Sequence, residues 1–421
     1  MAFLLLGLIF AFLLLGVPVG FSLWLTGLIV VLTTGVTSPT QIAQSIYTGL
    51  DSFVLLAIPF FILAGNIMLR SGFAKYLFDF MQAIVGKVPG GASIGATGAT
   101  AIFGAMTGSS VASAAALGRV MIPTMEGLGY PKRYTAGLIG AGGTLGILIP
   151  PSVTFVIYGE MAQQSVKDLF IAGVVPGLIA ATAIGIVAFT IALKRGYGRA
   201  TEPFSLCVLW RTFRMAAPAL LMPAIVLGGI YAGFFTPTEA AAISVVYGLF
   251  VALVVYRTIG LEDLPRIFVE SARSTGAILF ILSGALFIGM LATLAGIPAA
   301  IVTGIDAFHL SPLGFLFVTS AVLLVLGCFL DGFTLLTVVT PMLLPSVHAL
   351  GIDPIHFAIV LVLNIEIAAI TPPIGLNLFV IAGISGTTMR DVVVGVIPFM
   401  LAMAAVLVLL ILVPALSVIL L

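Results

Sequence analysis

The sequence predicts an all-α integral membrane protein built from two inverted repeats, each with a re-entrant hairpin and a helix broken at a Pro-Pro pair. Three observations support this fold class: scarce charge, an internal repeat of proline and glycine positions, and the distribution of basic residues. Of 421 residues, 61% are hydrophobic and 7% charged, and the mean hydropathy is +1.32. Because soluble chains carry about 25% charged residues, a water-exposed globule of this size is excluded.

Apolar runs recur from end to end of the chain, and no long polar stretch separates them. Runs of roughly 18 to 25 residues can cross about 30 Å of hydrocarbon, so we expect residues 1–421 to form a single membrane domain. The first residues lack the basic segment of a cleaved signal peptide. Cys207 and Cys328 fit no metal or disulfide spacing. A net charge of +1 excludes nucleic-acid binding through a basic surface.

Two halves of the chain, about 1–196 and 216–421, repeat one pattern at an offset of 222 residues. The aligned pairs are Pro123 with Pro345, Gly129 with Gly351, Pro150-Pro151 with Pro372-Pro373, Gly173 with Gly395, and Pro176 with Pro398. Proline and glycine fix backbone shape, so the alignment predicts the same fold twice. Each half begins with two closely spaced segments, then has one span and a short amphipathic stretch. A pair of short segments, a span interrupted by Pro-Pro and a final span complete it.

These elements divide into an expected scaffold and an expected transport core. The scaffold comprises 1–36 and 216–256, where 1–36 could instead be one long kinked span. The core comprises about 88–194 and 311–414, together with the spans 52–69 and 274–293. The amphipathic stretches 73–87 and 297–310 are expected to lie along the membrane surface as connecting arms, with a short core helix as the alternative for 73–87.

Basic residues indicate the orientation of the two halves. If the short paired segments enter and leave by one face, each half crosses the membrane five times, and an odd number inverts the second half relative to the first. The positive-inside rule then assigns one face to the cytoplasm. With that parity all sixteen Lys and Arg except Lys167 and Arg119 fall on it: Arg70, Lys75, Lys87, Lys132, Arg133, Lys194, Arg195, Arg199, Arg211, Arg214, Arg257, Arg266, Arg273 and Arg390.

Broken helices in inverted repeats indicate a binding site near the bilayer midplane, because unwound backbone is tolerated there only where it is buried or lines a cavity. Four segments qualify: 104–113, 140–152, 327–337 and 364–377. Hairpin tips and Pro-Pro breaks leave backbone N–H and C=O groups free. Carbonyls and hydroxyls suit Na⁺, whereas helix N-termini favour anions. The residues with suitable chemistry are Gly108, Ser109 and Ser110 at one tip, Asp331, Gly332 and Thr334 at the other, and Thr144, Thr371 and Asn377 beside the breaks.

Each of these features has a structural alternative. Small and hydroxyl residues in membrane helices often mark close helix packing, but four such segments at symmetric places, with Asp331 and Glu366 among them, favour a site. Arg119 has two interpretations: it holds a substrate carboxylate, or it extends toward water. The three histidines are expected to be solvated in outward loops. No nucleophile elbow, nucleotide-binding loop, zinc spacing or dinucleotide fingerprint occurs.

The motifs GSSVAS followed by AAALG and MIP, CFLDGFTLL, and TPPIGLNLFVIAG resemble the large membrane subunit of TRAP (tripartite ATP-independent periplasmic) transporters. The likeness covers essentially the whole chain, including GVPVGFSL and FFTPTEAAA. It implies a multi-pass protein of the bacterial inner membrane with the elevator-type ion-transporter fold. It also implies a separate small four-helix membrane subunit, a periplasmic substrate-binding protein, an organic acid substrate such as a C4-dicarboxylate or sialic acid, and no cofactor besides Na⁺ as coupling ion.

On this basis we expect Na⁺-coupled import by an elevator mechanism, with two Na⁺ sites and one substrate site. The expected Na⁺ ligands are Gly108, Ser109, Ser110, Gly143, Gly146, Asp331, Gly332, Thr334, Ala369, Thr371 and Pro373. The expected substrate contacts are Ser110, Ser113, Arg119, Thr144, Pro151, Thr337 and Asn377. The alternatives are a standalone Na⁺-coupled dicarboxylate symporter, an intramembrane enzyme, for which no catalytic set is visible, and a channel, which the closed site disfavours.

Overall fold

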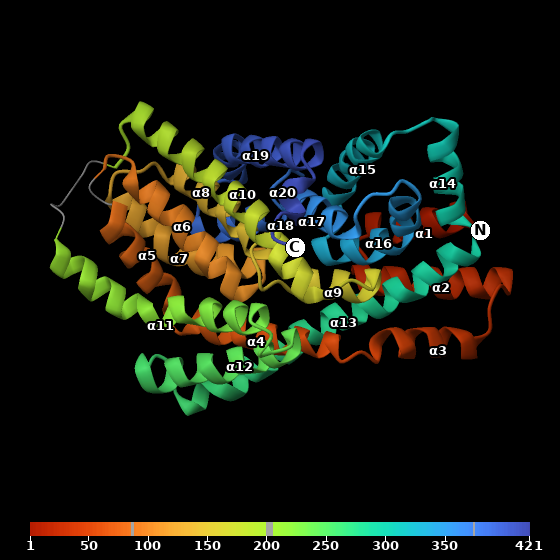
Figure 1. Ribbon diagram of the computed structural model, residues 1–421, viewed down its shortest axis with the longest axis horizontal. Coiled ribbons are helices and arrows are strands. Elements are labelled where there is room, and N and C mark those ends of the chain that lie inside the picture. The colour runs from red at the N-terminus through yellow and green to blue at the C-terminus, as the bar shows by residue number, and fades with distance from the viewer. Residues whose placement is uncertain (86–87, 199–204, 374) are drawn as a thin grey trace.

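The computed structural model describes residues 1–85, 88–198, 205–373 and 375–421, and it places no strand among them (Figure 1). The first half contains α1 (Ala2–Leu14), α2 (Val19–Thr34), α3 (Pro39–Leu50), η1 (Val54–Leu56), α4 (Ala57–Arg70), α5 (Phe73–Val85), α6 (Gly91–Thr107), α7 (Ser110–Gly127), α8 (Lys132–Leu148), α9 (Val153–Ala162) and α10 (Val166–Arg195). The second contains α11 (Leu206–Tyr231), α12 (Pro237–Phe250), the π turn η2 (Val251–Val255), η3 (Leu261–Asp263), α13 (Leu264–Leu294), α14 (Ile297–Ala307), α15 (Pro312–Gly327), α16 (Gly332–Ala349), α17 (Pro354–Ala369), α18 (Leu376–Ser385), α19 (Met389–Leu412) and α20 (Ala415–Val418).

Several helices are long and apolar enough to cross a membrane, which confirms the predicted class. Within the described ranges six helices meet this condition, and up to eight do if each of two bent helix pairs is one span. One bent pair is α8 with α9, whose axes differ by 40° at the Pro-Pro break. The other joins α3 to the helix at Val54–Arg70, with a bend of 64°.

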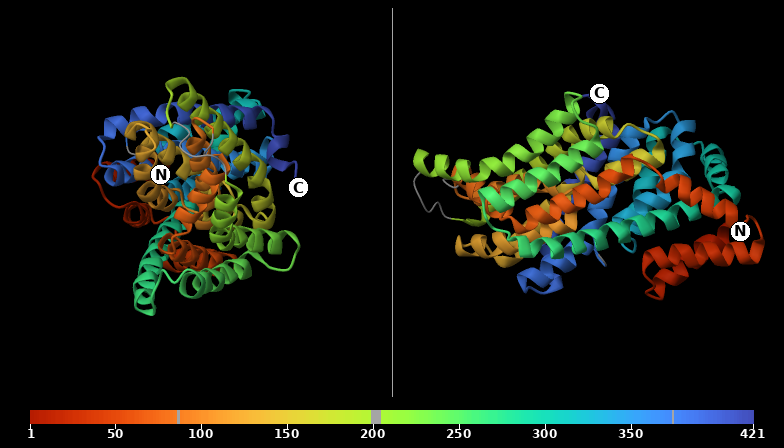
Figure 2. Two further views of the ribbon diagram at one scale, coloured as in Figure 1. Left: turned by 90° about the vertical axis from the view of Figure 1, so that its left-hand side faces the viewer. Right: turned by 90° about the horizontal axis from the view of Figure 1, so that it is seen from below.

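The order of helices recurs at the predicted offset of 222. The helix α7 corresponds to α16 residue for residue at both ends, and α8 and α17 agree to within one residue. Both Pro-Pro bonds, Pro150-Pro151 and Pro372-Pro373, are cis. The hairpin α6–α7 lies toward one end of the long axis of the molecule, and the hairpin α15–α16 lies toward the other end (Figures 1 and 2). The sequence repeat is therefore a repeat of structure.

Each hairpin turns at a helix cap that the sequence supplies. Gly108 ends α6 with φ +60°, in the left-handed region where only glycine is unstrained. Ser109 then caps α7, and its hydroxyl accepts from the backbone N–H of Ala112. At the equivalent position Asp331 caps α16 and accepts from the N–H groups of Phe333 and Thr334. Short polar side chains at N-cap positions satisfy otherwise free donors, so they fix both turns.

Glycines let helices of the two halves approach closely. A Cβ on Gly137 of α8 would lie 2.2 Å from the carbonyl of Gly395 in α19, and one on Gly395 would meet the Arg133 oxygen at 2.1 Å. The second-half helix α18 packs against α7 and α8 of the first half. Its Ile381 side chain would lie 3.1 Å from a Cβ on Gly118. The two halves are thus interleaved and not side by side.

Replacing Gly137 with alanine is expected to destabilise the protein by about 2 kcal/mol or more, because the added methyl group overlaps backbone that cannot rotate away. The thermal unfolding midpoint in detergent measures the loss. Gly140→Ala is the matched control on the same helix, since its nearest neighbour would be Ile381 Cγ1 at 3.8 Å. It should be neutral or stabilising because alanine favours helix. Equal midpoints for both variants would contradict the close crossing.

Some segments differ from the sequence-based expectation. The segment 39–50 forms the helix α3, which was not predicted, and α13 begins about ten residues earlier than the expected span. His309 and His348 are exposed as expected, but the prediction is wrong for His356. This side chain is 2% exposed, and its Nδ1 lies 3.0 Å from the Ser417 hydroxyl oxygen, because α17 begins at Pro354 and α20 covers its start.

The two amphipathic stretches are helical as α5 and α14. Residues 86–87 of the first stretch, with Lys87, lie outside the described residues, as does Arg199. In α5 the side chains of Phe73, Leu77 and Phe78 are buried, while Lys75 and Ile84 are exposed. Their position along the membrane surface stays a prediction.

The inverted orientation predicts that equivalent positions of the halves reach opposite sides of the membrane. Lys132 begins α8 and Asp353 caps α17, and both are exposed. Single cysteines at these positions, with Cys207 and Cys328 replaced by serine, should be labelled by an impermeant maleimide from the cytoplasmic and the periplasmic side respectively. Labelling of both from one side would refute the inversion.

Candidate functional site

The first hairpin tip lies against the first Pro-Pro break. A Cβ on Gly108 would be 3.2 Å from the Pro151 carbonyl oxygen and 3.4 Å from the Val153 nitrogen. A Cβ on Gly146 of α8 would be 3.0 Å from Ser113 Oγ and 3.3 Å from the Ser109 carbonyl oxygen. The fold therefore brings together five of the predicted residues: Gly108, Ser109, Ser113, Gly146 and Pro151. Backbone oxygens of the tip and of the break lie in the same small region.

Hydroxyl groups add to this region. Thr107 Oγ1 and Ser113 Oγ are 2.6 Å apart, and both side chains are buried. Ser110 is also buried, whereas Ser109 is half-buried. After the break, Ser152 caps α9 without using its hydroxyl, and the Oγ atoms of Ser152 and Thr154 have no hydrogen-bond partner in the described chain. Neither residue was among the predicted ligands, although Ser152 ends the candidate segment 140–152 and Thr154 lies three residues after the Pro-Pro pair.

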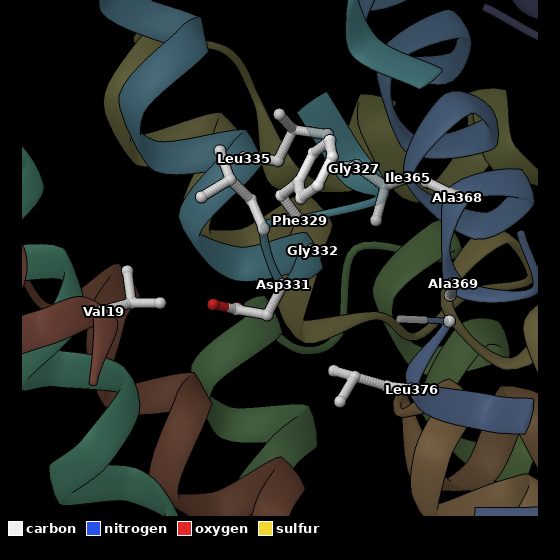
Figure 3. A pocket seen from close by; sticks show the side chains of 12 residues that line it. Val19, Gly327, Phe329, Asp331, Gly332, Leu335, Ile365, Ala368, Ala369 and Leu376 are labelled. Carbon is white, nitrogen blue, oxygen red and sulfur yellow. The ribbon is translucent and has the colours of Figure 1, made fainter. Parts of the chain in front are cut away.

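The second tip and the second break enclose a cavity of about 210 Å³ (Figure 3). Residues from the tip and from both sides of the break line it, as does Val19 at the start of α2; the full set is Val19, Gly327, Phe329, Leu330, Asp331, Gly332, Leu335, Ile365, Ala368, Ala369, Gly375 and Leu376. Figure 3 shows the Asp331 side chain directed toward Val19, while Ala369 and Leu376 lie on the other side. Of the predicted ion ligands, Asp331, Gly332 and Ala369 thus share one cavity.

Several of the predicted hydroxyl groups already donate their proton to a neighbour in the chain. The Thr337 hydroxyl donates to the Phe333 carbonyl at 2.8 Å, and the Thr371 hydroxyl donates to the Ile367 carbonyl at 2.6 Å. Thr144 likewise donates to the Ala141 carbonyl at 2.5 Å. In each case the accepting carbonyl lies three or four residues earlier in the chain. Thr334 donates to Asp331 at 2.5 Å and thereby orients the carboxylate. Pro373 is exposed.

Unpaired polar atoms are concentrated near the second break. Glu366, in the last turn of α17, is fully buried, and neither carboxylate oxygen has a hydrogen-bond partner in the part of the chain that the structure describes. The same holds for both amide atoms of Asn377, at the start of α18. The large majority of buried polar atoms in proteins have a hydrogen-bond partner. Those left free at a helix break are therefore candidates to hold an ion, water or substrate.

Arg119 lies apart from the tips. It is exposed on α7, nine residues beyond Ser110, and lines a separate cavity between α4, α7 and α13. The structure brings Ser110, Ser113 and Pro151 together but does not place Arg119 with them. Asn377 is buried at the start of α18, a second-half helix that packs against α7 and α8.

Comparisons with known proteins agree with the resemblance in the motifs. The family model described as tripartite ATP-independent periplasmic transporter, DctM component, matches residues 6–416. The C4-dicarboxylate TRAP transporter large permease protein of Rhodobacter capsulatus is 40% identical, over 99% of this chain and 98% of the relative. The sialic acid TRAP transporter large permease protein of Vibrio cholerae is 35% identical, over 96% and 93%.

A third relative is the 2,3-diketo-L-gulonate TRAP transporter large permease protein of Escherichia coli, which is 34% identical over 95% of this chain and 94% of its own. Among solved structures, the YdaH transporter of Alcanivorax borkumensis matches with a TM-score of 0.65 and 12% identity. The match covers 88% of this chain and 86% of that chain. At this identity the likeness concerns the fold alone.

Proposed function

This chain belongs to the DctM component family of tripartite ATP-independent periplasmic transporters, and on that premise we propose that it is the translocating subunit of a Na⁺-coupled importer of organic acids. It is a multi-pass large permease and not an enzyme, because its relatives are transporter permeases. The intramembrane enzyme is thereby set aside. The proposed partners are a small four-helix membrane subunit and a periplasmic binding protein that delivers the substrate.

An organic acid is the proposed substrate class because the named relatives carry C4-dicarboxylate, sialic acid and 2,3-diketo-L-gulonate. All three are organic anions. The proposed substrate contacts are Ser110, Ser113, Thr144, Pro151, Thr337 and Asn377, and Arg119 contributes positive charge farther along α7. The N-termini of α7, α9, α16 and α18 begin at the tips and breaks, and helix N-termini favour anionic groups.

Two Na⁺ sites related by the repeat form the proposed coupling machinery. The first lies between Gly108, Ser109, Ser110 and the backbone of Gly143 to Gly146. The second lies between Asp331, Gly332, Thr334 and the backbone from Ala369 through Thr371 to Pro373. The observation that carries this assignment is the approach of each tip to its Pro-Pro break: Gly108 lies against the Pro151 carbonyl oxygen, and Asp331, Gly332 and Ala369 line one cavity. Carbonyl and hydroxyl oxygens at helix breaks are suitable ligands for Na⁺.

An elevator movement is the proposed mechanism. The hairpins and broken helices of both halves share one hydrophobic core, to which α11 and α12 also contribute. Residues of α1, α2, α3, α13 and α14, together with Met342 of α16, form a second, smaller core. The scaffold segment 1–36 is therefore packed largely apart from the hairpin core, whereas 216–256 packs with it, and this partial separation supports a movement of the core relative to 1–36.

Replacement of Na⁺ tests the coupling ion. The chain, its small subunit and its loaded binding protein are reconstituted together, and uptake is measured with external Na⁺ or with choline. Uptake should fall to the level of protein-free liposomes in choline. Uptake that persists in choline and follows a pH gradient would overturn Na⁺ coupling and assign protons instead.

A further inference from the structure

The cavity that contains Arg119 is distinct from both hairpin tips. It has a volume of about 630 Å³ and lies between α4, α7, η3 and α13. Its lining includes Asn66, Arg70, Arg119, Arg266 and Glu270, and none of the tip residues. It is three times as large as the 210 Å³ cavity at the second tip.

The charged residues that line the cavity are only partly paired with one another. The Arg70 Nη2 lies 2.9 and 2.7 Å from the two carboxylate oxygens of Glu270, and Arg266 Nε lies 3.2 Å from one of them. The carboxylate of Asp263 accepts from the Gly260 N–H at 2.9 Å. Three guanidinium groups and two carboxylates therefore line the cavity, with a net charge of +1. Arg70 and Arg266 share Glu270, whereas Arg119 and Asp263 form no salt bridge with any described residue.

Helical geometry connects this cavity to the first tip. Nine residues separate Ser110 from Arg119 on α7, which corresponds to about 14 Å at 1.5 Å per residue. Between them Ala115 and Ala116 line the cavity and leave room beside the helix. Arg70 and Arg266 belong to the basic residues that the positive-inside rule assigns to the cytoplasm. The cavity thus lies beside α7 beyond the tip, from Ala115 onward, on the side that this rule assigns to the cytoplasm.

We infer that this cavity is a second anion-binding station, in which Arg119 binds a carboxylate group that has left the tip. Arginine presents a planar fork that matches a carboxylate, and Glu270 already occupies Arg70 and Arg266. Exposed ion pairs are weak, so the station holds the anion briefly and releases it. The inference rests on the proposed function for the direction of travel, but binding at the cavity can be measured without transport.

A cysteine at Ala116 reports on the cavity. With Cys207 and Cys328 replaced by serine, Ala116→Cys is reacted with anionic and cationic methanethiosulfonate reagents in inside-out vesicles that contain the complete transporter. The anionic reagent should react about three- to tenfold faster than the cationic one. Succinate, used as the probe, should slow the anionic reaction, while chloride at equal ionic strength should not. Ala115→Cys provides a second reporter should the first fail to fold.

Arg119 variants decide the assignment. Arg119→Gln should remove both the charge preference and the protection by succinate, and Arg119→Lys should restore the preference. Arg273→Gln removes an exposed charge of the same helix as Glu270 without touching the cavity, and it should behave as the parent. Protection that survives Arg119→Gln would overturn the station even where Na⁺-driven uptake is normal. Absence of Na⁺-driven uptake with intact protection would instead refute the proposed function and leave the station standing.

Discussion

Proteoliposomes that contain only this chain are expected to take up no more organic acid than protein-free liposomes, even with an inward Na⁺ gradient. The reason lies in the slight scaffold. The helix α1 has 13 residues and α2 has 16, whereas about 20 residues are needed to cross a bilayer. A body that slides needs a rigid partner. Among the described helices of the proposed scaffold only α11 and the helix Pro237–Val255 are long enough to span a bilayer, so the short helices of 1–36 need another protein beside them.

Apolar surface on α11 and α12 shows where further support can attach. Leu206, Trp210, Val246 and Phe250 are between 54% and 72% exposed. An apolar groove of about 580 Å³ runs between these two helices. In a bilayer such a surface packs against lipid or against another membrane helix, and the small subunit of the proposed system supplies such helices.

Omission of one component at a time measures this dependence. Uptake of radiolabelled succinate should appear only when the small subunit and the loaded binding protein are both present, the latter on the periplasmic side. Free succinate without binding protein serves as the control. Robust uptake of free substrate by the chain alone would contradict the tripartite assignment and favour a standalone symporter.

The sequence predicted the turning points of the fold better than its ends. The offset of 222 placed Ser109 opposite Asp331, and both cap the second helix of a hairpin. Helix caps and glycines determine the backbone conformation within a few residues, so the turns that they form can be predicted from the local sequence. The helix α3 was missed although Ser38, Pro39 and Gln41 form a capping box with proline at the first turn, a signal that the sequence contains.

Asp331→Asn is expected to raise the Na⁺ concentration for half-maximal uptake by about tenfold, equivalent to about 1.4 kcal/mol. Asparagine caps a helix about as well as aspartate, so the hairpin turn should persist while the negative charge in the 210 Å³ cavity is lost. A cation near that cavity loses Coulomb attraction. Uptake by the complete transporter is measured as a function of Na⁺ at a saturating concentration of loaded binding protein.

Asp353→Asn is the matched control. Asp353 also caps a helix and accepts from two backbone N–H groups, those of Ile355 and His356, but it does not line the cavity. Its replacement should leave the Na⁺ dependence unchanged. An equal shift for both variants, or none for Asp331→Asn, would remove the carboxylate from the coupling site.

Placement of the site residues was harder to predict than their chemistry. The motifs brought Ser113, Pro151 and Gly146 to the first tip as expected, because hairpin and break are adjacent in the repeat. Arg119 instead faces a cavity completed by α13, more than 140 residues away in the chain. The expected span began only at residue 274, whereas the ion pair between Arg266 and Glu270, four residues apart, stabilises the earlier start of α13. Only tertiary packing shows which helix meets Arg119.

The interleaving of α8 with α19 has a consequence for biosynthesis. Gly137 leaves the ribosome about 260 residues before Gly395, and at roughly 5–20 residues per second the delay is about 13 to 50 s. The hydrogen bond from the Tyr158 hydroxyl to the Pro354 carbonyl oxygen, 2.7 Å long, likewise cannot form until Pro354 has been synthesised. During translation the first half therefore resides in the bilayer with its glycine-lined faces uncovered. Its native packing is completed only when the last long helix arrives, so a nascent chain cannot acquire a finished binding site before synthesis is nearly over.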